Sequence, residues 1–284
     1  AITSGNLQDA FRDRPPRSEL TFRRKAEDQN FLVRFPLGLK AGSFRLPKGL
    51  VSGQKLNQIL RRLTLPVATA TDFDDLPTPF RAVATDLESG DAVVLGDGDL
   101  VTAMRASISA PGVFTPVELD GRLLVDGGLA ENLPVDVARA MGVDRLIVVD
   151  VGFPLQKRNR LDSVGTISNQ MLAILIRRGS NAQRGTLGPD DVVIDPQLGE
   201  ASSFDFGQVG RAIELGEAAA RAGGERLAAL AVGADEYRGY LAMREAARRG
   251  VPVIDYVRVA EGEQRYGRPL EALFGPLRGS APDA

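Results

Sequence analysis

The stretch Leu123–Gly128 reads LLVDGG, in which a short apolar run ends in an acid and two glycines. This pattern is typical of a strand that delivers a carboxylate, here Asp126, to its own carboxyl end. The two following residues have no Cβ atom and let another backbone or a substrate approach closely. Ligand sites of open α/β sheets lie at the carboxyl ends of strands. The sequence therefore predicts a functional carboxylate at Asp126.

An Asp-Gly pair is also the commonest signal for a short hairpin, which would give Asp126 a purely structural role. A better hairpin candidate lies upstream, where Asp120 and Gly121 separate Val117–Leu119 from Arg122–Val125. That hairpin already explains the reversal of the chain. Asp126 is then left at a strand end with no turn to account for it.

The composition limits the partners of the chain. It has 284 residues, of which 43% are hydrophobic, with 35 basic and 37 acidic side chains. These values are typical of an ordinary globular protein with one large domain and room for a smaller one. The near-zero net charge gives no electrostatic reason to expect a nucleic acid as a partner.

The absence of two residue types limits the chemistry. The chain contains no Cys and no His. A Ser-His-Asp or Cys-His pairing cannot form within it, and neither can a thiolate- or His-ligated metal site. Hydrolytic chemistry would need a carboxylate as its base, and no cofactor is expected. No run approaches the ~18 consecutive apolar residues that a membrane-spanning helix needs.

The pattern before the LLVDGG stretch predicts a helix, a hairpin and a second helix. Gly53 precedes an apolar stripe at helical spacing, formed by Leu56, Ile59, Leu60 and Leu63. Phe80–Asp86 alternates as a strand does, and Ala92–Leu95 is its expected hairpin partner. Leu100–Ile108 follows as a helix that ends at Pro111 and Gly112.

The pattern after that stretch alternates between helices and strands. A helix is expected from Pro134 to Gly142, and the β-branched run Arg145–Val151 predicts a strand buried on both faces of a parallel sheet. Val164–Leu175 is amphipathic, and Val192–Ile194 indicates another buried strand. Strands that alternate with helices favour the α/β class, with helices on both faces of the sheet.

Three stretches together resemble the patatin-like phospholipases of bacteria. They are residues 80–90, 105–114 and 125–134, and the similarity extends over roughly residues 7–220. The resemblance implies a three-layer α/β fold with a mostly parallel sheet, and a lipid acyl hydrolase with a Ser-Asp dyad and no catalytic His. It assigns Asp126 to the dyad. The residues that it places around the site are Gly127, Gly128, Ser107, Ser109, Pro111 and Gly112.

The family's nucleophile has no counterpart in this chain. It lies in a G-x-S-x-G elbow that follows a glycine-rich oxyanion loop, and both precede the region of resemblance. Ser43, Ser52, Ser107 and Ser109 all lack the paired glycines of such an elbow. We interpret Ser107 and Ser109 as a helix end that packs beside the site.

Two explanations remain for the missing elbow: a fragment without its amino-terminal part, or a pseudoenzyme that lost its nucleophile and serves as a membrane or protein interaction scaffold. The fragment is favoured, because a stable scaffold does not decay by losing whole elements at both ends. We therefore expect the sheet to be incomplete at its amino end and the 284 residues to be inactive alone.

The domain organisation expected from the sequence has three parts. Residues 1–220 form the acyl hydrolase domain, residues 221–250 a helical linker, and residues 251–284 the start of a further domain. Val253–Val259 and Leu270–Phe274 resemble the opening strand and helix of a POTRA domain. The alternative is an ordinary terminal hairpin of the main domain.

Two other classes of protein were considered. The acids Asp72, Asp74, Asp75, Asp97 and Asp99 suggest a metal site, but they lack the spacing of a calcium loop and are better interpreted as solvated loops. Residues 237–249 combine tyrosines and arginines as a lipid-binding helix does, although packing on the chain's own domain is the more common explanation.

The partners follow from the resemblance. We expect a phospholipid or other lipid ester as the substrate and a membrane surface as a contact. We expect a bacterial protein at the membrane, in the cell envelope or secreted, with the cytoplasm as the alternative. The oligomeric state stays open.

Overall fold

The computed structural model describes residues 51–152, 154–199 and 208–247, the backbone of residues 38–40 and 43–45, and the single residues 49, 253, 274, 279 and 280. Apart from residues 253 and 274, the POTRA-like strand and helix lie outside the described residues. The chain divides into two compact units. The first comprises residues 1–56, 82–95 and 102–232, and the second residues 57–81, 96–101 and 233–284.

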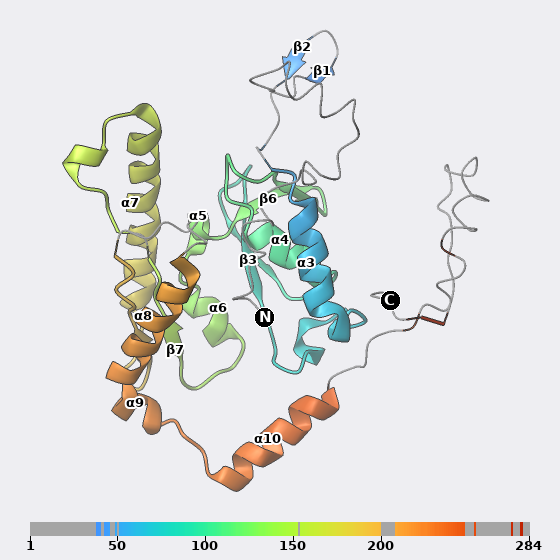
Figure 1. Ribbon diagram of the computed structural model, residues 1–284, viewed down its shortest axis with the longest axis vertical. Helices are drawn as coiled ribbons and strands as arrows, with labels where there is room; N and C mark the ends of the chain where they lie inside the picture. The colour runs from blue at the N-terminus through green and yellow to red at the C-terminus, as the bar shows by residue number, and fades with distance from the viewer. Residues whose placement is uncertain are drawn as a thin grey trace. The chain divides into compact units, whose positions relative to one another are not determined.

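The largest sheet belongs to the first unit and has four antiparallel strands in the order β4-β3-β6-β5 (Figure 1). Its strands are β3 (Ala82–Asp86), β4 (Ala92–Leu95), β5 (Val117–Leu119) and β6 (Arg122–Asp126). Both hairpins predicted from the sequence are confirmed. In the second, Asp120 and Gly121 have φ values of 50° and 75°, as a two-residue type I′ turn requires.

The expectation of a mostly parallel sheet is wrong for these four strands. Short turns join β3 to β4 and β5 to β6, and short turns can connect only antiparallel neighbours. The pairing of β3 with β6 sets Ala84 opposite Asp126. Leu124 packs with Ala84 and with Ala106 of helix α4 (Leu100–Ser107), and all three are buried. The strand that ends at Asp126 is thereby anchored in a core.

A separate pair of strands in the same unit is parallel. It consists of β7 (Ile147–Val149) and β8 (Val192–Ile194), in register from Ile147 opposite Val192. Arg184 Nη1 lies 3.2 Å from Oδ2 of Asp150 and 3.2 Å from Oδ2 of Asp195. Asp150 directly follows β7, and Asp195 directly follows β8. Val148 is buried in a cluster with Leu133, Val135 and Leu146.

The predicted burial of this run on both faces is wrong. Ile147 and Val149 point to the other face of β7 and are 54% and 50% exposed. Side chains alternate along a strand, so packing Val148 inward turns both neighbours outward.

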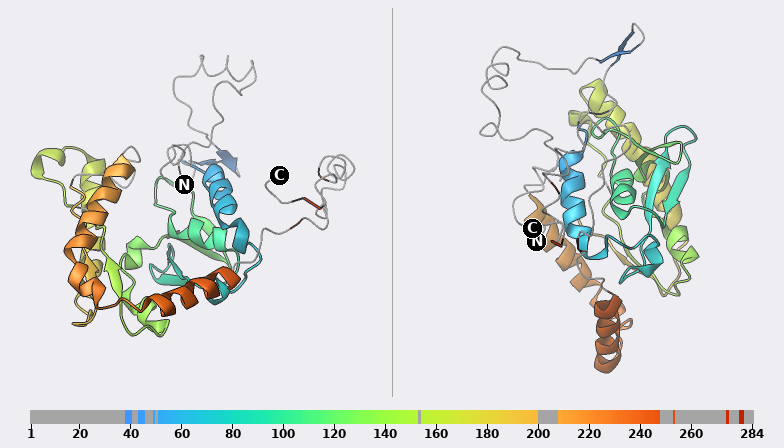
Figure 2. Two further views of the ribbon diagram at one scale, coloured as in Figure 1. Left: turned by 60° about the horizontal axis from the view of Figure 1, so that its bottom comes forward. Right: turned by 90° about the vertical axis from the view of Figure 1, so that its right-hand side faces the viewer.

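Short helices connect the sheets of the first unit. They are α5 (Gly128–Glu131) and α6 (Val135–Ala140), and the longer α7 (Val164–Arg184) runs beside α5 (Figures 1 and 2). A capping box between Ser163 and Thr166 fixes the start of α7. The remaining helices of this unit are α8 (Val209–Ala222) and α9 (Gly224–Ala228). Strands β1 (Gly38–Lys40) and β2 (Ser43–Arg45) form a small antiparallel pair.

The second unit contains most of α3 (Gln54–Thr64) and all of α10 (Ala234–Ala247). Phe73 is fully buried there against Phe80, with ring centroids 6.1 Å apart. No residue of α10 is buried. Across the described residues, no helix is both long enough and apolar enough to cross a membrane.

Candidate active site

Asp126 is the last residue of β6, as the sequence predicts, and its backbone is held on two sides. Its N–H donates to the carbonyl oxygen of Ser109 (3.0 Å), and its carbonyl oxygen accepts from the Thr85 hydroxyl (2.8 Å). Thr85 Oγ1 also accepts the N–H of Ala130 at 3.1 Å. Asp126 is therefore fixed between strand β3, the loop after α4 and helix α5.

Other atoms lie so close to the two residues after Asp126 that both positions favour glycine. A Cβ atom on Gly127 would lie 2.1 Å from the carbonyl oxygen of Val83, in the middle of β3. A Cβ atom on Gly128 would lie 3.0 Å from Asn132 Oδ1 and 3.1 Å from Asp126 Oδ1. The first contact is with backbone, which cannot rotate away. The glycine at 127 lets the turn after β6 pack directly on the neighbouring strand.

The carboxylate of Asp126 makes one hydrogen bond and is partly shielded from water. Its Oδ1 accepts the N–H of Gly128 at 2.8 Å, as an aspartate at a helix start often does. Burial raises the pKa of Asp126 above its usual range, and the Gly128 N–H opposes this shift. Within the described residues, no Arg or Lys pairs with Asp126 and no hydrogen bond reaches Oδ2.

The two candidate serines differ in their surroundings. Ser109 is fully buried; its hydroxyl donates to the carbonyl oxygen of Arg105 (2.6 Å) and accepts from the Arg105 guanidinium. Ser107 is the last residue of α4 and half-buried. Pro111 and Gly112 are exposed, and nothing lies within 4 Å of where a Gly112 Cβ would be. Of these four residues, Ser109 alone has a hydrogen bond to Asp126, through its backbone carbonyl oxygen.

Arg105 is a buried residue that the sequence interpretation missed. It is 4% exposed, and its guanidinium donates to the carbonyl oxygens of Ser52 (3.1 Å) and Thr115 (3.3 Å). It also lies 4.4 Å from the centre of the Phe114 ring. Arg105 thus joins the chain before α3 to the loop that carries Ser109. The signal in the sequence is a single arginine within the otherwise uncharged helix Leu100–Ser107.

Glu131 is a second missed residue, at the end of α5. Burial first, and then the neighbouring carboxyl of Asp136, raise the pKa of Glu131 to about 7. Gln183 of α7 donates to Glu131 Oε1, and Asn132 donates to Ser180 of the same helix at 3.2 Å. These contacts attach the segment after Asp126 to α7. The sequence gives no sign of them, because α5 and α7 are distant along the chain.

The acidic residues considered for a metal site have other partners. Asp72 accepts the N–H of Asp74 at 2.9 Å, and Asp74 receives two hydrogen bonds from Arg81, at 2.7 and 2.8 Å. Asp99 pairs with Arg61 at 3.0 Å. Among the described residues, no three acidic side chains are grouped so that they could hold a metal ion.

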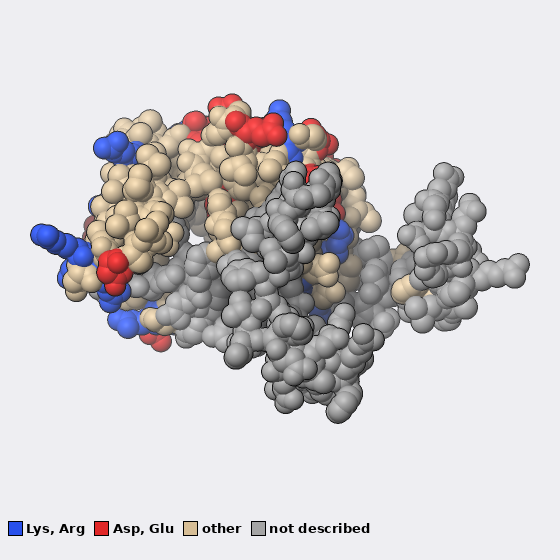
Figure 3. All heavy atoms as spheres, turned by 90° about the horizontal axis from the view of Figure 1, so that it is seen from above, with Lys and Arg blue, Asp and Glu red and all other residues tan. Residues whose placement is uncertain are grey.

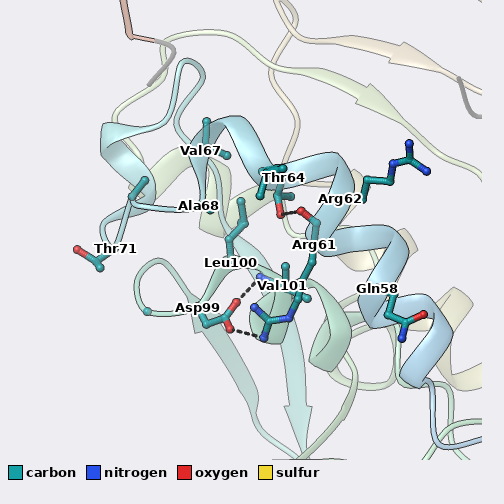
Figure 4. A pocket seen from close by; sticks show the side chains of 13 residues that line it. Gln58, Arg61, Arg62, Thr64, Val67, Ala68, Thr71, Asp99, Leu100 and Val101 are labelled. Carbon is teal, nitrogen blue, oxygen red and sulfur yellow. Dashed lines mark hydrogen bonds and ion pairs between the residues drawn. The ribbon is translucent and has the colours of Figure 1, made fainter. Parts of the chain in front are cut away.

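A cavity of about 680 Å³ lies in the second unit, between α3 and residues 98–101 (Figure 4). The Arg61–Asp99 ion pair lies on its wall, beside Val67, Ala68 and Leu100. Neither Asp126 nor any residue predicted around it lines this cavity.

Comparison with known proteins places the candidate site inside a recognised domain. The family model "Patatin-like phospholipase" matches residues 8–139, a range that contains Asp126 and every residue predicted around it. The match supports a patatin-like family for this part of the chain.

Relatives of this chain come from bacteria and mammals. An uncharacterized NTE family protein of Mycobacterium tuberculosis is 41% identical over 103 residues, which cover 36% of this chain and 28% of the relative. A second uncharacterized NTE family protein of Mycobacterium tuberculosis is 32% identical over 173 residues, which cover 54% of this chain and 30% of the relative. Patatin-like phospholipase domain-containing protein 7 of Mus musculus is 44% identical over 82 residues, which cover 28% of this chain and 6% of the relative.

The matched parts span less than a third of these relatives' own lengths. The family model and the names of these relatives all refer to patatin-like or NTE family proteins.

Proposed function

We propose that this protein is a lipid acyl hydrolase in which Asp126 is the general base for a serine nucleophile. The observation that carries the proposal is the state of Asp126. It is a half-buried carboxylate at the end of β6, it lies within the matched residues 8–139, and its Oδ2 makes no hydrogen bond to the described residues. A general base needs an available lone pair and a pKa nearer to the working pH. Burial moves the pKa of Asp126 in that direction.

The proposed reaction has two steps that share one base. Asp126 Oδ2 takes the serine proton as the serine oxygen attacks the ester carbonyl carbon, and the carbonyl electrons move onto its oxygen. When they return, the bond to the alcohol breaks, and the alcohol leaves with the proton held by Asp126. The acyl group is then bound to serine. Water loses a proton to the same carboxylate and attacks the acyl carbon. The bond to serine then breaks, the proton returns from Asp126 to the serine oxygen, and the fatty acid is released.

The proposal places the nucleophilic serine outside residues 1–284. No G-x-S-x-G sequence occurs within them. Ser109 is unsuited to attack, because its hydroxyl is fully buried and engaged with Arg105. Ser107, in the last turn of α4, is the remaining candidate near the site.

The test compares two aspartates with the same local geometry. Asp86 is the last residue of β3, is half-buried like Asp126, and accepts the N–H of Glu88 at 3.0 Å, two residues ahead. The register sets Ala84 opposite Asp126 and Asp86 opposite Leu124, so the two aspartates lie diagonally across neighbouring strands, and Asp86→Asn removes a nearby charge without touching the proposed base. Asp126→Asn should lower hydrolysis of lysophospholipids and nitrophenyl esters by the intact protein about 10²- to 10⁴-fold. Asp86→Asn should leave it within about twofold, because a carboxamide still accepts the turn hydrogen bond.

Two outcomes would overturn parts of this assignment. Equal activity in the Asp126→Asn and unchanged proteins would remove Asp126 from the dyad. Strong hydrolysis by residues 1–284 alone, lost in Ser107→Ala, would place the nucleophile on α4.

A further inference from the structure

Helix α7 carries an apolar stripe on its outer face. Val164, Ile167, Met171 and Leu175 are 83%, 48%, 62% and 61% exposed. Residues three and four apart lie on the same face of a helix, so the four side chains form one row. A row of this kind at the surface marks an interaction site more often than isolated apolar residues do.

The opposite face of α7 is already occupied. It packs on α5 and α6, with Ser180 buried and bonded to Asn132, and with Gln183 bonded to Glu131. The helix cannot turn its apolar row inward without breaking these bonds. The row is therefore a fixed feature of the outer surface of the first unit.

Basic residues precede and follow the apolar row along the chain. Residues 154–184 include six basic residues and one acidic residue, Asp162, although the whole chain has a net charge of −2. The basic residues are Lys157, Arg158, Arg160, Arg177, Arg178 and Arg184. All but Arg184 are exposed. Figure 3 views the molecule from above and shows Lys and Arg side chains at its left, with an acidic side chain among them.

The loop before α7 is attached to the helix. The N–H of Gln156 donates to Gln170 Oε1 (2.9 Å), and Gln170 Nε2 donates back to the carbonyl oxygen of Gln156 (3.2 Å). This reciprocal pair holds the basic residues that follow Gln156 beside the second turn of α7, next to the apolar row.

We propose that α7 and the preceding loop dock the protein on a membrane surface that contains anionic lipids. An apolar row flanked by Lys and Arg is the arrangement that lies in the lipid headgroup region and attracts anionic headgroups. A second copy of this chain fits less well, since a symmetric contact of α7 with itself would bring basic residues against basic residues. The proposal concerns attachment and does not depend on the hydrolase reaction.

Helix α10 provides a natural comparison. Its Met243 is 66% exposed, close to the 62% of Met171. However, α10 places Asp235, Glu236 and Glu245 among its arginines, so it offers no excess of positive charge. Over its described residues, the helix with tyrosines and arginines that the sequence offered for lipid binding is therefore the weaker candidate; its last two arginines, Arg248 and Arg249, lie outside the described residues.

The first experiment measures sedimentation of the intact protein with vesicles of phosphatidylcholine, with and without phosphatidylserine. Binding should require phosphatidylserine and should weaken with added salt. Lys157→Glu combined with Arg158→Glu should weaken it about fivefold or more per residue changed, and Arg122→Glu, in the β5–β6 hairpin, should not. Asp126→Asn should bind normally, so failure of the hydrolase proposal and failure of this one are distinguishable.

The second experiment uses the absence of cysteine from the chain. Met171→Cys and Met243→Cys, each labelled with a polarity-sensitive dye, report the environment of two equally exposed positions. We expect a blue shift with phosphatidylserine vesicles at position 171 and none at position 243. Three outcomes would overturn the proposal. The first two are equal shifts at both positions and no shift at position 171. The third is a shift at position 171 that depends on protein concentration without vesicles, which would identify α7 as a contact between copies.

Discussion

Replacing Gly127 with alanine should destabilise the protein strongly, because the new methyl group has no space. Its Cβ atom would lie 2.1 Å from the carbonyl oxygen of Val83, whereas ordinary contact begins near 3.4 Å. Either β3 or the turn after Asp126 must move by roughly 1 Å, and overpacking of this kind costs about 3 kcal/mol. The contacted carbonyl group belongs to the backbone of β3, which pairs with β4 and β6, so a side-chain rotation cannot relieve the contact.

Gly216→Ala, in the middle of α8, is the matched control. Nothing lies within 4 Å of its new Cβ atom, and alanine in a helix interior is more stable than glycine by about 0.5–1 kcal/mol. Urea unfolding followed by circular dichroism should therefore move the two midpoints in opposite directions. A Gly127→Ala protein as stable as the unchanged one would refute the close packing of the turn on β3, and with it the structural reason for a glycine after Asp126.

Three further predictions concern the residues around the site. Arg105→Met should lower the free energy of unfolding by about 3 kcal/mol, because the carbonyl oxygens of Ser52 and Thr115 lose buried donors; an unchanged urea midpoint would contradict this. The free energy of unfolding should fall as the pH rises from 4.5 to about 7, since folded Glu131 keeps a proton that the unfolded chain releases. Urea titrations at several pH values measure this slope, and Glu131→Gln should remove it. The hydrolysis rate should fall in acid with a midpoint above 3.8, because burial raises the pKa of Asp126; a pH-rate profile with a midpoint at or below 3.8 would contradict the proposed base.

The sequence predicted local features well. The Asp120-Gly121 turn, helix α4 and strand β8 are confirmed, because turn residues and side-chain periodicity act over a few neighbouring residues. The position of Asp126 at the end of a strand follows from the same kind of signal.

Strand direction and burial were predicted less well. The resemblance suggested a mostly parallel sheet, but the described residues contain four antiparallel strands and one parallel pair. The contact of Gly127 with Val83 and the bonds of Arg105 to Ser52 and Thr115 join segments that are remote or irregular in sequence. Periodicity carries no information about which segments meet. A charged residue such as Arg105 also gives no sign of burial, since its environment depends entirely on these partners.

The exposed face of β7 affects how readily the protein aggregates while it is synthesised and folds. Ile147, Val149 and Val151 form an apolar row on a β-branched segment, of the kind that seeds aggregation when it is left open. Its partner β8 is made more than 40 residues later, so the segment leaves the ribosome before its pairing strand exists. Charged residues lie beside and within this segment: Asp144 and Arg145 precede Ile147, and Asp150 lies between Val149 and Val151. We expect Asp144 and Arg145 to act as gatekeepers against self-association, and neutralising these two residues should reduce the yield of soluble protein.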